Sequence, residues 1–145
     1  MSAIEIYRFL KKFYNLGSNK GAYYLKRMIY ILYKCYIPYT AEIEEGTTLG
    51  YGGIGVVIHS NAVIGKNLKI GQGVTIGSRG FNPIIGDNVY ILPGAKCLTK
   101  EIGSNVIIGA NSVVVKDIPS NCVVVGVPAR VISKDISKYS SYFKK

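Results

Sequence analysis

From residue 58 to residue 75 the chain reads Ile58-His59-Ser60-Asn61-Ala62-Val63, Ile64-Gly65-Lys66-Asn67-Leu68-Lys69 and Ile70-Gly71-Gln72-Gly73-Val74-Thr75. An aliphatic residue opens each six-residue unit, Gly usually follows it, and a smaller or β-branched residue usually stands at the fifth place. The register is interrupted after Gly77, returns at Ile85 and continues to Val113. A short fixed period is the sequence signature of a solenoid, in which each unit is stable only when stacked on the unit one turn away.

Two other interpretations of this stretch fail. A helix would carry Gly at nearly every sixth position, at a cost of about 1 kcal/mol each. An ordinary strand ladder would show long runs of alternating apolar and polar residues, which the chain lacks. Gly and Asn between short apolar pairs suit turns with positive φ. We therefore predict a mainly β chain, with a parallel β-helix over 39–132, a helical segment over 1–38 and a basic tail over 133–145.

Over roughly residues 39–132 the repeat resembles the hexapeptide-repeat acyltransferase family. The resemblance implies a left-handed parallel β-helix with three hexapeptides per turn, a homotrimer, and acetyl-CoA bound in a groove between subunits. General crossover rules would favour a right-handed coil, so the left hand comes from the resemblance alone. Three segments are most similar to the serine acetyltransferase-like branch, which also contains O-acetyltransferases of surface polysaccharides: Gly73-Val74-Thr75-Ile76-Gly77, Ile85-Gly86-Asp87-Asn88-Val89 and Gly126-Val127-Pro128-Ala129-Arg130.

Composition narrows the class of protein. The 145 residues suit one domain, and 48% hydrophobic content supports a sizeable core. Cys35, Cys97 and Cys122 are odd in number and widely spaced, which predicts neither a disulfide framework nor a metal site. We expect Cys97, at an aliphatic place of the repeat, to be a buried free thiol in a reducing compartment. No apolar run reaches the roughly 20 residues that span a bilayer, and no signal peptide is evident, so we expect a cytoplasmic protein.

The net charge of +10 lies at the two ends of the chain. Residues 1–38 carry seven Lys/Arg and one acid, residues 130–145 carry five and one, and residues 39–129 carry six of each sign. Residues 3–16 and 20–36 are predicted amphipathic helices. One interpretation is that they cap the first turn of the coil. The other adds peripheral contact with the inner face of a membrane, because Lys and Arg beside Tyr suit the headgroup region. We expect no nucleic-acid partner.

The single histidine, His59, is the candidate catalytic base. Acyl transfer to an alcohol needs a base, donors for the oxyanion and a groove for the thioester, and imidazole is the side chain that titrates nearest to neutral pH. His59 could equally be an exposed turn residue or a packing residue. As orienting partners, Glu42, Glu44 and Glu45 are candidates only through proximity in sequence. One histidine also excludes the zinc-dependent carbonic anhydrases that share this coil, since they need three, and we expect no metal.

The resemblance also implies residues that would hold acetyl-CoA as co-substrate. Gly77, Ser78 and Ala110 would lie along the pantetheine arm, and Arg79, Lys116 and Arg130 would meet the phosphates. Each basic residue is also compatible with solvated surface. The interruption at residues 77–84 is predicted to leave the coil as a loop, where functional residues are common, and in the family a loop here overhangs the neighbouring subunit's active site.

Two positions depart from serine acetyltransferases. In those enzymes the catalytic histidine lies in an Asp-His segment that aligns near Tyr51-Gly52, and the supporting aspartate aligns near Tyr36. The glycine-rich stretch around Tyr51 suits close approach of a ligand or another backbone, or a bulge at one corner. The first functional hypothesis is transfer of an acetyl group from acetyl-CoA to a sugar hydroxyl, as a small-molecule or glycan acceptor, in surface polysaccharide or glycolipid synthesis. The basic, aromatic ends of the chain favour it, because they would lie near a membrane-bound acceptor. The alternatives are a short serine O-acetyltransferase and a non-catalytic β-helix scaffold or binding module.

Overall fold

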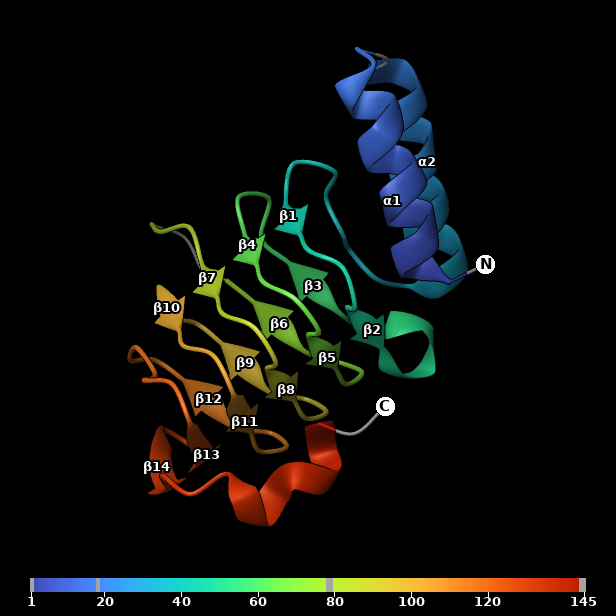
Figure 1. Cartoon of the computed structure of the whole chain (residues 1–145). Coiled ribbons are helices and arrows are strands. Elements are labelled where there is room, and N and C mark those ends of the chain that lie inside the picture. The colour runs from blue at the N-terminus through green and yellow to red at the C-terminus, as the bar shows by residue number, and fades with distance from the viewer. Residues whose placement is uncertain (1, 18, 78–79, 144–145) are drawn as a thin grey trace.

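A coil of short strands forms the centre of the computed structural model, which describes residues 2–17, 19–77 and 80–143 (Figure 1). Sheet 1 holds β1 (Glu42–Ile43), β4 (Val63–Ile64), β7 (Ile84–Ile85) and β10 (Glu101–Ile102). Sheet 2 holds β2 (Thr48–Leu49), β5 (Lys69–Ile70), β8 (Tyr90–Ile91), β11 (Val106–Ile108), β13 (Cys122–Gly126) and β14 (Ala129–Ser133). Sheet 3 holds β3 (Val57–Ile58), β6 (Thr75–Ile76), β9 (Lys96–Cys97) and β12 (Val113–Val114).

Each strand pairs in parallel with the strand one turn away, except β14, which pairs antiparallel with β13. The predicted parallel β-helix is therefore confirmed. The chain turns at three corners, which we name by the sheets they join. Corner 1–2 comprises residues 44–47, 65–68, 86–89, 103–105 and 119–121. Corner 2–3 comprises residues 50–56, 71–74, 92–95 and 109–112. Corner 3–1 comprises residues 59–62, 77, 80–83, 98–100 and 115–117.

The aliphatic residue that opens each unit points into the coil. In register along the sheets, Ile64 lies beside Ile85, and Ile70 lies beside Ile91. Complete burial of one such side chain contributes roughly 1.5–3 kcal/mol, so the repeat itself builds the core. The residues of this column are each no more than 2% exposed: Ile58, Ile64, Ile70, Ile76, Ile85, Ile91, Cys97, Ile102 and Ile108.

Asparagines stabilise corner 1–2. Asn67, Asn88, Asn105 and Asn121 all have φ between 53° and 59°, a left-handed conformation that Asn tolerates better than most residues. The side-chain amide of each of the first three donates to the side-chain oxygen of the next, over 3.0, 3.2 and 2.9 Å. The ladder joins successive turns along the corner and confirms that Asn marks turns with positive φ.

Two helices stand beside the first turn of the coil (Figure 1). Helix α1 (Ala3–Asn15) begins with a capping box between Ser2 and Glu5, and its Tyr7 hydroxyl donates to the Ala41 carbonyl oxygen at 2.7 Å. Helix α2 (Asn19–Tyr33) ends three residues before the predicted end at residue 36. Lys34 is left-handed, with φ of 52°, and Tyr36 already pairs with Val57 of the coil. Among the described residues, no helix is long and apolar enough to cross a membrane.

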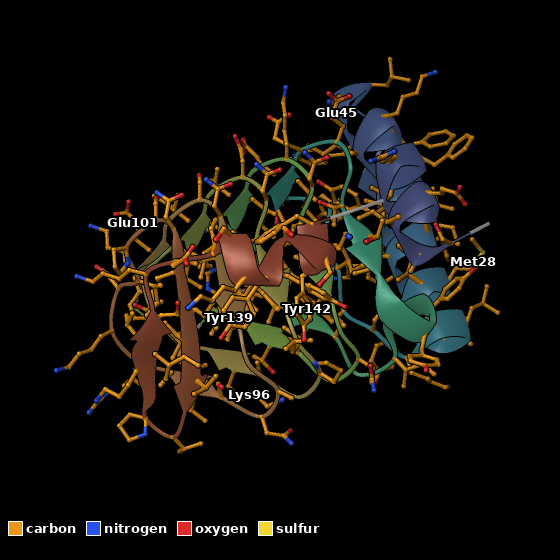
Figure 2. All side chains as sticks on the ribbon, turned by 60° about the horizontal axis from the view of Figure 1, so that its bottom comes forward. Met28, Glu45, Lys96, Glu101, Tyr139 and Tyr142 are labelled. Atoms are coloured by element: carbon orange, nitrogen blue, oxygen red, sulfur yellow. The ribbon has the colours of Figure 1, made fainter. Side chains whose placement is uncertain are left out.

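The C-terminal segment folds back over sheet 2. The 3₁₀ helix η2 (Ser137–Phe143) lies across the strands, and Figure 2 shows Tyr139 and Tyr142 on it. The Tyr142 ring packs against Tyr90, with centroids 5.4 Å apart, and the Lys69 ammonium donates to the Tyr142 carbonyl oxygen at 2.9 Å. The division of the chain at residues 38 and 132 stays a prediction.

Candidate active site

His59 lies on corner 3–1, directly after β3. Its backbone N–H donates to the Ile76 carbonyl oxygen at 2.9 Å, and its own carbonyl oxygen accepts from the Ala62 N–H at 3.1 Å. The half-buried imidazole accepts, through Nδ1, a hydrogen bond from the Asn61 backbone N–H at 3.2 Å. A neutral ring that accepts at Nδ1 carries its proton on Nε2. In this tautomer His59 offers a donor, and it becomes a base at Nε2 only when it gives up the bond to Asn61.

The carboxylates proposed as orienting partners lie elsewhere. Glu44 and Glu45 belong to corner 1–2, where they line a pocket of about 550 Å³ together with Arg8 and Lys11 of α1. Glu42 opens β1 and lines the same pocket. These three side chains therefore face the helical segment, whereas the hydrogen bond that the His59 ring accepts comes from Asn61.

Gly77, where the repeat is interrupted, packs closely against His59. Gly77 follows β6 one turn beyond His59 and has φ of 104°. A side chain at Gly77 would collide with Cβ of His59, and it would come within 3.1 Å of the His59 Cγ and 3.2 Å of the Pro83 Cγ. The Asn61 side-chain amide donates to the Asn82 side-chain oxygen at 3.2 Å, which ties the loop to the same turn. Ser78 and Arg79, both predicted to hold acetyl-CoA, lie outside the described residues.

Sequence reasoning missed Asn61 and Asn82. Asn61 stands at an ordinary turn position of the repeat, and Asn82 falls where the repeat is interrupted, so no periodic signal marks their contact. The sequence offered only one indication of this contact. Each of the two segments, which must meet at one corner, carries a polar amide side chain.

Lys116 lies on the same corner as His59, three turns further along the coil. It is exposed, and it lies two residues after the end of β12. Its neighbour Asp117 accepts hydrogen bonds from the Thr99 hydroxyl at 2.7 Å and the Glu101 N–H at 2.9 Å. The Thr99 bond, more than the backbone bond, lowers the pKa of Asp117. A fixed carboxylate therefore stands beside Lys116.

Of the other two predicted acetyl-CoA contacts, Ala110 lies on corner 2–3 and Arg130 lies on the strand β14 beside it. Ala110 is exposed on that corner, and Arg130 is exposed on β14, where it pairs with Val125. The two regions are in contact, because the Gly126 N–H donates to the Ser112 hydroxyl oxygen at 3.1 Å. A single chain therefore brings His59, Gly77 and Lys116 to one edge and places Ala110 and Arg130 at another.

Tyr51 occupies the first turn of corner 2–3, in the 3₁₀ turn η1 (Gly50–Gly53). It has φ of 50° and ψ of 39°, and 81% of its surface is exposed. The glycines around it let the chain approach the end of α2, since the Gly55 N–H donates to the Lys34 carbonyl oxygen at 2.9 Å. The interpretation as close approach of another backbone is therefore correct. Tyr51 also lines a pocket of about 260 Å³ together with Lys69 and Gln72.

The three cysteines are unsuited to nucleophilic chemistry. All are buried free thiols, as predicted for Cys97. Burial raises the pKa of Cys97 to about 12 and that of Cys35 to about 11, and it also raises the pKa of Cys122. Thiolates are therefore scarce at neutral pH. In the part of the chain that the structure describes, no group of three or more His, Cys, Asp or Glu could hold a metal ion.

Curated relatives of this chain are serine acetyltransferases, although no family model matches it. That of Synechococcus elongatus is 47% identical over 102 residues, which are 63% of this chain and 42% of the relative. That of Staphylococcus aureus is 46% identical over 105 residues, 65% of this chain and 49% of the relative. That of Buchnera aphidicola is 35% identical over 150 residues, 99% of this chain and 57% of the relative.

Solved structures agree. A serine acetyltransferase in complex with CoA matches with a TM-score of 0.82 and 33% identity, over 90% of this chain and 55% of that one. The serine acetyltransferase of Neisseria gonorrhoeae matches with a TM-score of 0.85 and 34% identity, over 99% and 58%. The chain belongs to the hexapeptide-repeat acyltransferase family. It lies on the serine acetyltransferase-like branch, and its β-helix is left-handed. It spans about half the length of the relatives it matches.

These matches correct the predicted acceptor. The sugar hypothesis rested partly on the basic, aromatic N-terminal helices as a sign of a membrane-bound glycan. The Neisseria match covers 99% of the chain, so the helices belong to a fold that a serine acetyltransferase shares, and they do not indicate a glycan. The hypothesis of a sugar hydroxyl in polysaccharide or glycolipid synthesis is therefore wrong.

Proposed function

We propose that this chain transfers the acetyl group of acetyl-CoA to the hydroxyl of serine. One observation carries the proposal: a serine acetyltransferase in complex with coenzyme A, from Brucella abortus, matches 92% of this chain with a TM-score of 0.84 and 34% identity. In the reaction, the serine oxygen attacks the thioester carbon, the hydroxyl proton passes to a base, and the CoA sulfur leaves and takes up a proton.

Within this proposal, His59 is the base. The ring would first give up its hydrogen bond with Asn61 and move its proton from Nε2 to Nδ1. In that tautomer Nε2 is free to take the hydroxyl proton. Gly77 would leave room for the carrier arm beside the imidazole. Ser78, predicted along the arm, and Arg79, predicted at the phosphates, lie outside the described residues. Ala110 would lie along the arm as well, and Lys116 and Arg130 would meet its phosphates.

We also propose that the protein is a homotrimer and that two subunits complete each site. The candidate residues lie on two different corners of one chain, so neither corner holds a full set. The outer faces of sheets 1 and 3, which flank corner 3–1, expose Val57, Val63 and Ile84 to 43–44%. Cyclic closure would bury such patches on every copy. Light scattering at micromolar concentration should give three times the chain mass, and a monomeric mass would refute this assembly.

The decisive experiment measures acetyl transfer directly. The protein is incubated with acetyl-CoA and L-serine, CoA release is followed with a thiol reagent, and O-acetylserine is identified by mass spectrometry. L-Alanine, which lacks the hydroxyl, is the matched acceptor control. His59→Ala should lower the turnover number by roughly 10²- to 10⁴-fold, the usual contribution of a positioned base, with little effect on CoA affinity. Turnover near that of the wild type would remove His59 from the mechanism.

A second candidate function is a non-catalytic module that binds CoA. It is favoured by the two tyrosines, Tyr51 and Tyr36, at the positions where serine acetyltransferases carry catalytic residues. A thermal shift with CoA, together with no O-acetylserine formation by the wild type, would support this module and refute the acetyl transfer. Absence of both signals would refute both candidates.

A further inference from the structure

Helix α2 presents an apolar and aromatic face to solvent. Tyr23, Tyr24, Tyr30 and Ile31 are 50–70% exposed, although Ala22 and Ile29 on the opposite side of the helix are completely buried. We call Tyr23, Tyr24, Arg27, Tyr30 and Ile31 the outer face of α2, since their spacing places them on one side of a helix. Contiguous exposed apolar side chains of this kind mark surfaces that another body covers.

The charge around this face has one sign. Between residues 6 and 41 the chain carries seven Lys and Arg and no acidic residue. Two of these cations contact tyrosine side chains. The Arg27 guanidinium donates to the Tyr23 hydroxyl at 3.2 Å, and the Lys26 ammonium lies 5.2 Å from the centre of the Tyr36 ring. The outer face therefore combines tyrosines, an aliphatic residue and fixed positive charge.

A hollow at the foot of the face suits an anionic group. It has a volume of about 440 Å³, and Lys26 and Arg27 line it together with Tyr23, Tyr30 and Tyr36. Phosphate oxygens accept hydrogen bonds from both kinds of cation. Tyrosine carries an apolar ring that suits lipid and a polar hydroxyl at its tip that suits water, which is why it gathers at the boundary between lipid and water.

We propose that the outer face of α2 docks on an anionic lipid surface, with its tyrosines at the level of the headgroups and with Lys26 and Arg27 on the lipid phosphates. The helix would lie along the surface, because no described helix can span a bilayer. A second copy of the chain is a poorer occupant, because two such faces in contact would oppose arginine and lysine without any acidic residue of α2. The proposal is independent of acetyl transfer.

Co-sedimentation of the full-length protein with vesicles tests the proposal. Vesicles of phosphatidylcholine with 30% phosphatidylglycerol should bind the protein, vesicles of phosphatidylcholine alone should not, and binding should weaken sharply between 0.1 and 1 M salt. Lys26→Gln with Arg27→Gln should weaken binding roughly fivefold for each charge removed. Lys134→Gln with Lys138→Gln removes the same charge from the exposed C-terminal tail, and this control should change binding less than about threefold.

The apolar part needs a variant of its own. Tyr24→Ser with Ile31→Ser keeps every charge, alters two exposed side chains, and should weaken vesicle binding at least about tenfold. Equal losses in the α2 and tail charge variants would show unspecific attraction and overturn the proposal. Light scattering without vesicles should give one mass for the wild type and the Ser variant. A lower mass for the variant would identify the face as a contact between subunits and would also overturn the proposal.

Discussion

Replacement of Gly77 by Ala should destabilise the protein and disturb His59 at the same time. Gly77 has φ of 104°, and an added Cβ would collide with the His59 Cβ and press on the Pro83 Cγ at 3.2 Å. Gly80 provides the matched control, because its φ is 101° and no atom lies within 4 Å of an added Cβ. The two substitutions therefore share the backbone cost and differ only in the space around the new methyl group.

The expected magnitudes follow from these two terms. Forcing a non-glycine residue to positive φ costs about 1–2 kcal/mol, which is the whole expected loss for Gly80→Ala. Gly77→Ala adds the cost of overpacking, about 1–3 kcal/mol, for a total of about 2–5 kcal/mol. At roughly 2–4 °C per kcal/mol for a chain of this size, the Tm of Gly77→Ala should fall about 2–12 °C below that of Gly80→Ala.

Thermal unfolding by circular dichroism, at one protein concentration for all variants, measures the first effect. The second is turnover with acetyl-CoA and serine at a temperature where both variants are folded. A shift of about 1 Å in a catalytic group can cost on the order of 10²-fold, so Gly77→Ala should lose turnover and Gly80→Ala should keep it. Equal stability and equal turnover of the two variants would refute the contact between the loop and His59.

Three further predictions concern the coil. Ile108 is fully buried, so Ile108→Asp would bury an unpaired charge at a cost of several kcal/mol, and the protein should be insoluble. A soluble, cooperatively folding variant would show that the assignment of inward-facing side chains is wrong. Asn88→Ala should lose about 1 kcal/mol more free energy of unfolding than Asn88→Gly, measured by urea unfolding. Both substitutions break the amide ladder, but only Gly adopts φ of 53° without strain, so equal losses would contradict the role of φ. The folded protein keeps Cys97 protonated, since burial raises its pKa from 9.0 to about 12, so the free energy of unfolding should fall as pH rises from 9 toward 12, and Cys97→Val should flatten that slope.

The coil could be predicted because its determinants are local. Ile70, Gly71 and the residues that follow repeat a six-residue unit. The period alone indicates which side chain faces inward, and all of the repeats indicate the same position. Asn67 and Asn88 mark corners for a reason that lies within one residue, its tolerance of positive φ. The left hand of the coil had no such local cause and came only from the resemblance.

The end of α2 could not be predicted in the same way. Tyr33 to Tyr36 continue an acceptable helical pattern, yet the backbone of Tyr36 donates to Val56 and accepts from Ile58 in the coil. That pairing is long-range, and its two hydrogen bonds outweigh a propensity worth a few tenths of a kcal/mol per residue. The site was harder still, because the contact of Asn61 with Asn82 joins a repeat position to an interruption of the repeat.

The separation of the candidate residues between corners leads to a final prediction, which depends on the proposed trimer. If each site takes His59 from one subunit and Arg130 from the next, His59→Ala and Arg130→Ala inactivate different halves of the same site. The two variants are refolded together at equal amounts, so that they form mixed trimers. A site is then intact where the subunit that supplies His59 carries only the Arg130 change and the subunit that supplies Arg130 carries only the His59 change. Random assembly makes this about one quarter of all sites. Turnover, measured at acetyl-CoA concentrations well below KM, should therefore rise in the mixture to about a quarter of the wild-type value, whereas each variant refolded alone stays inactive. A mixture no more active than the separate variants would place His59 and Arg130 in one subunit's site or outside any site, and either result would refute a groove shared between two subunits.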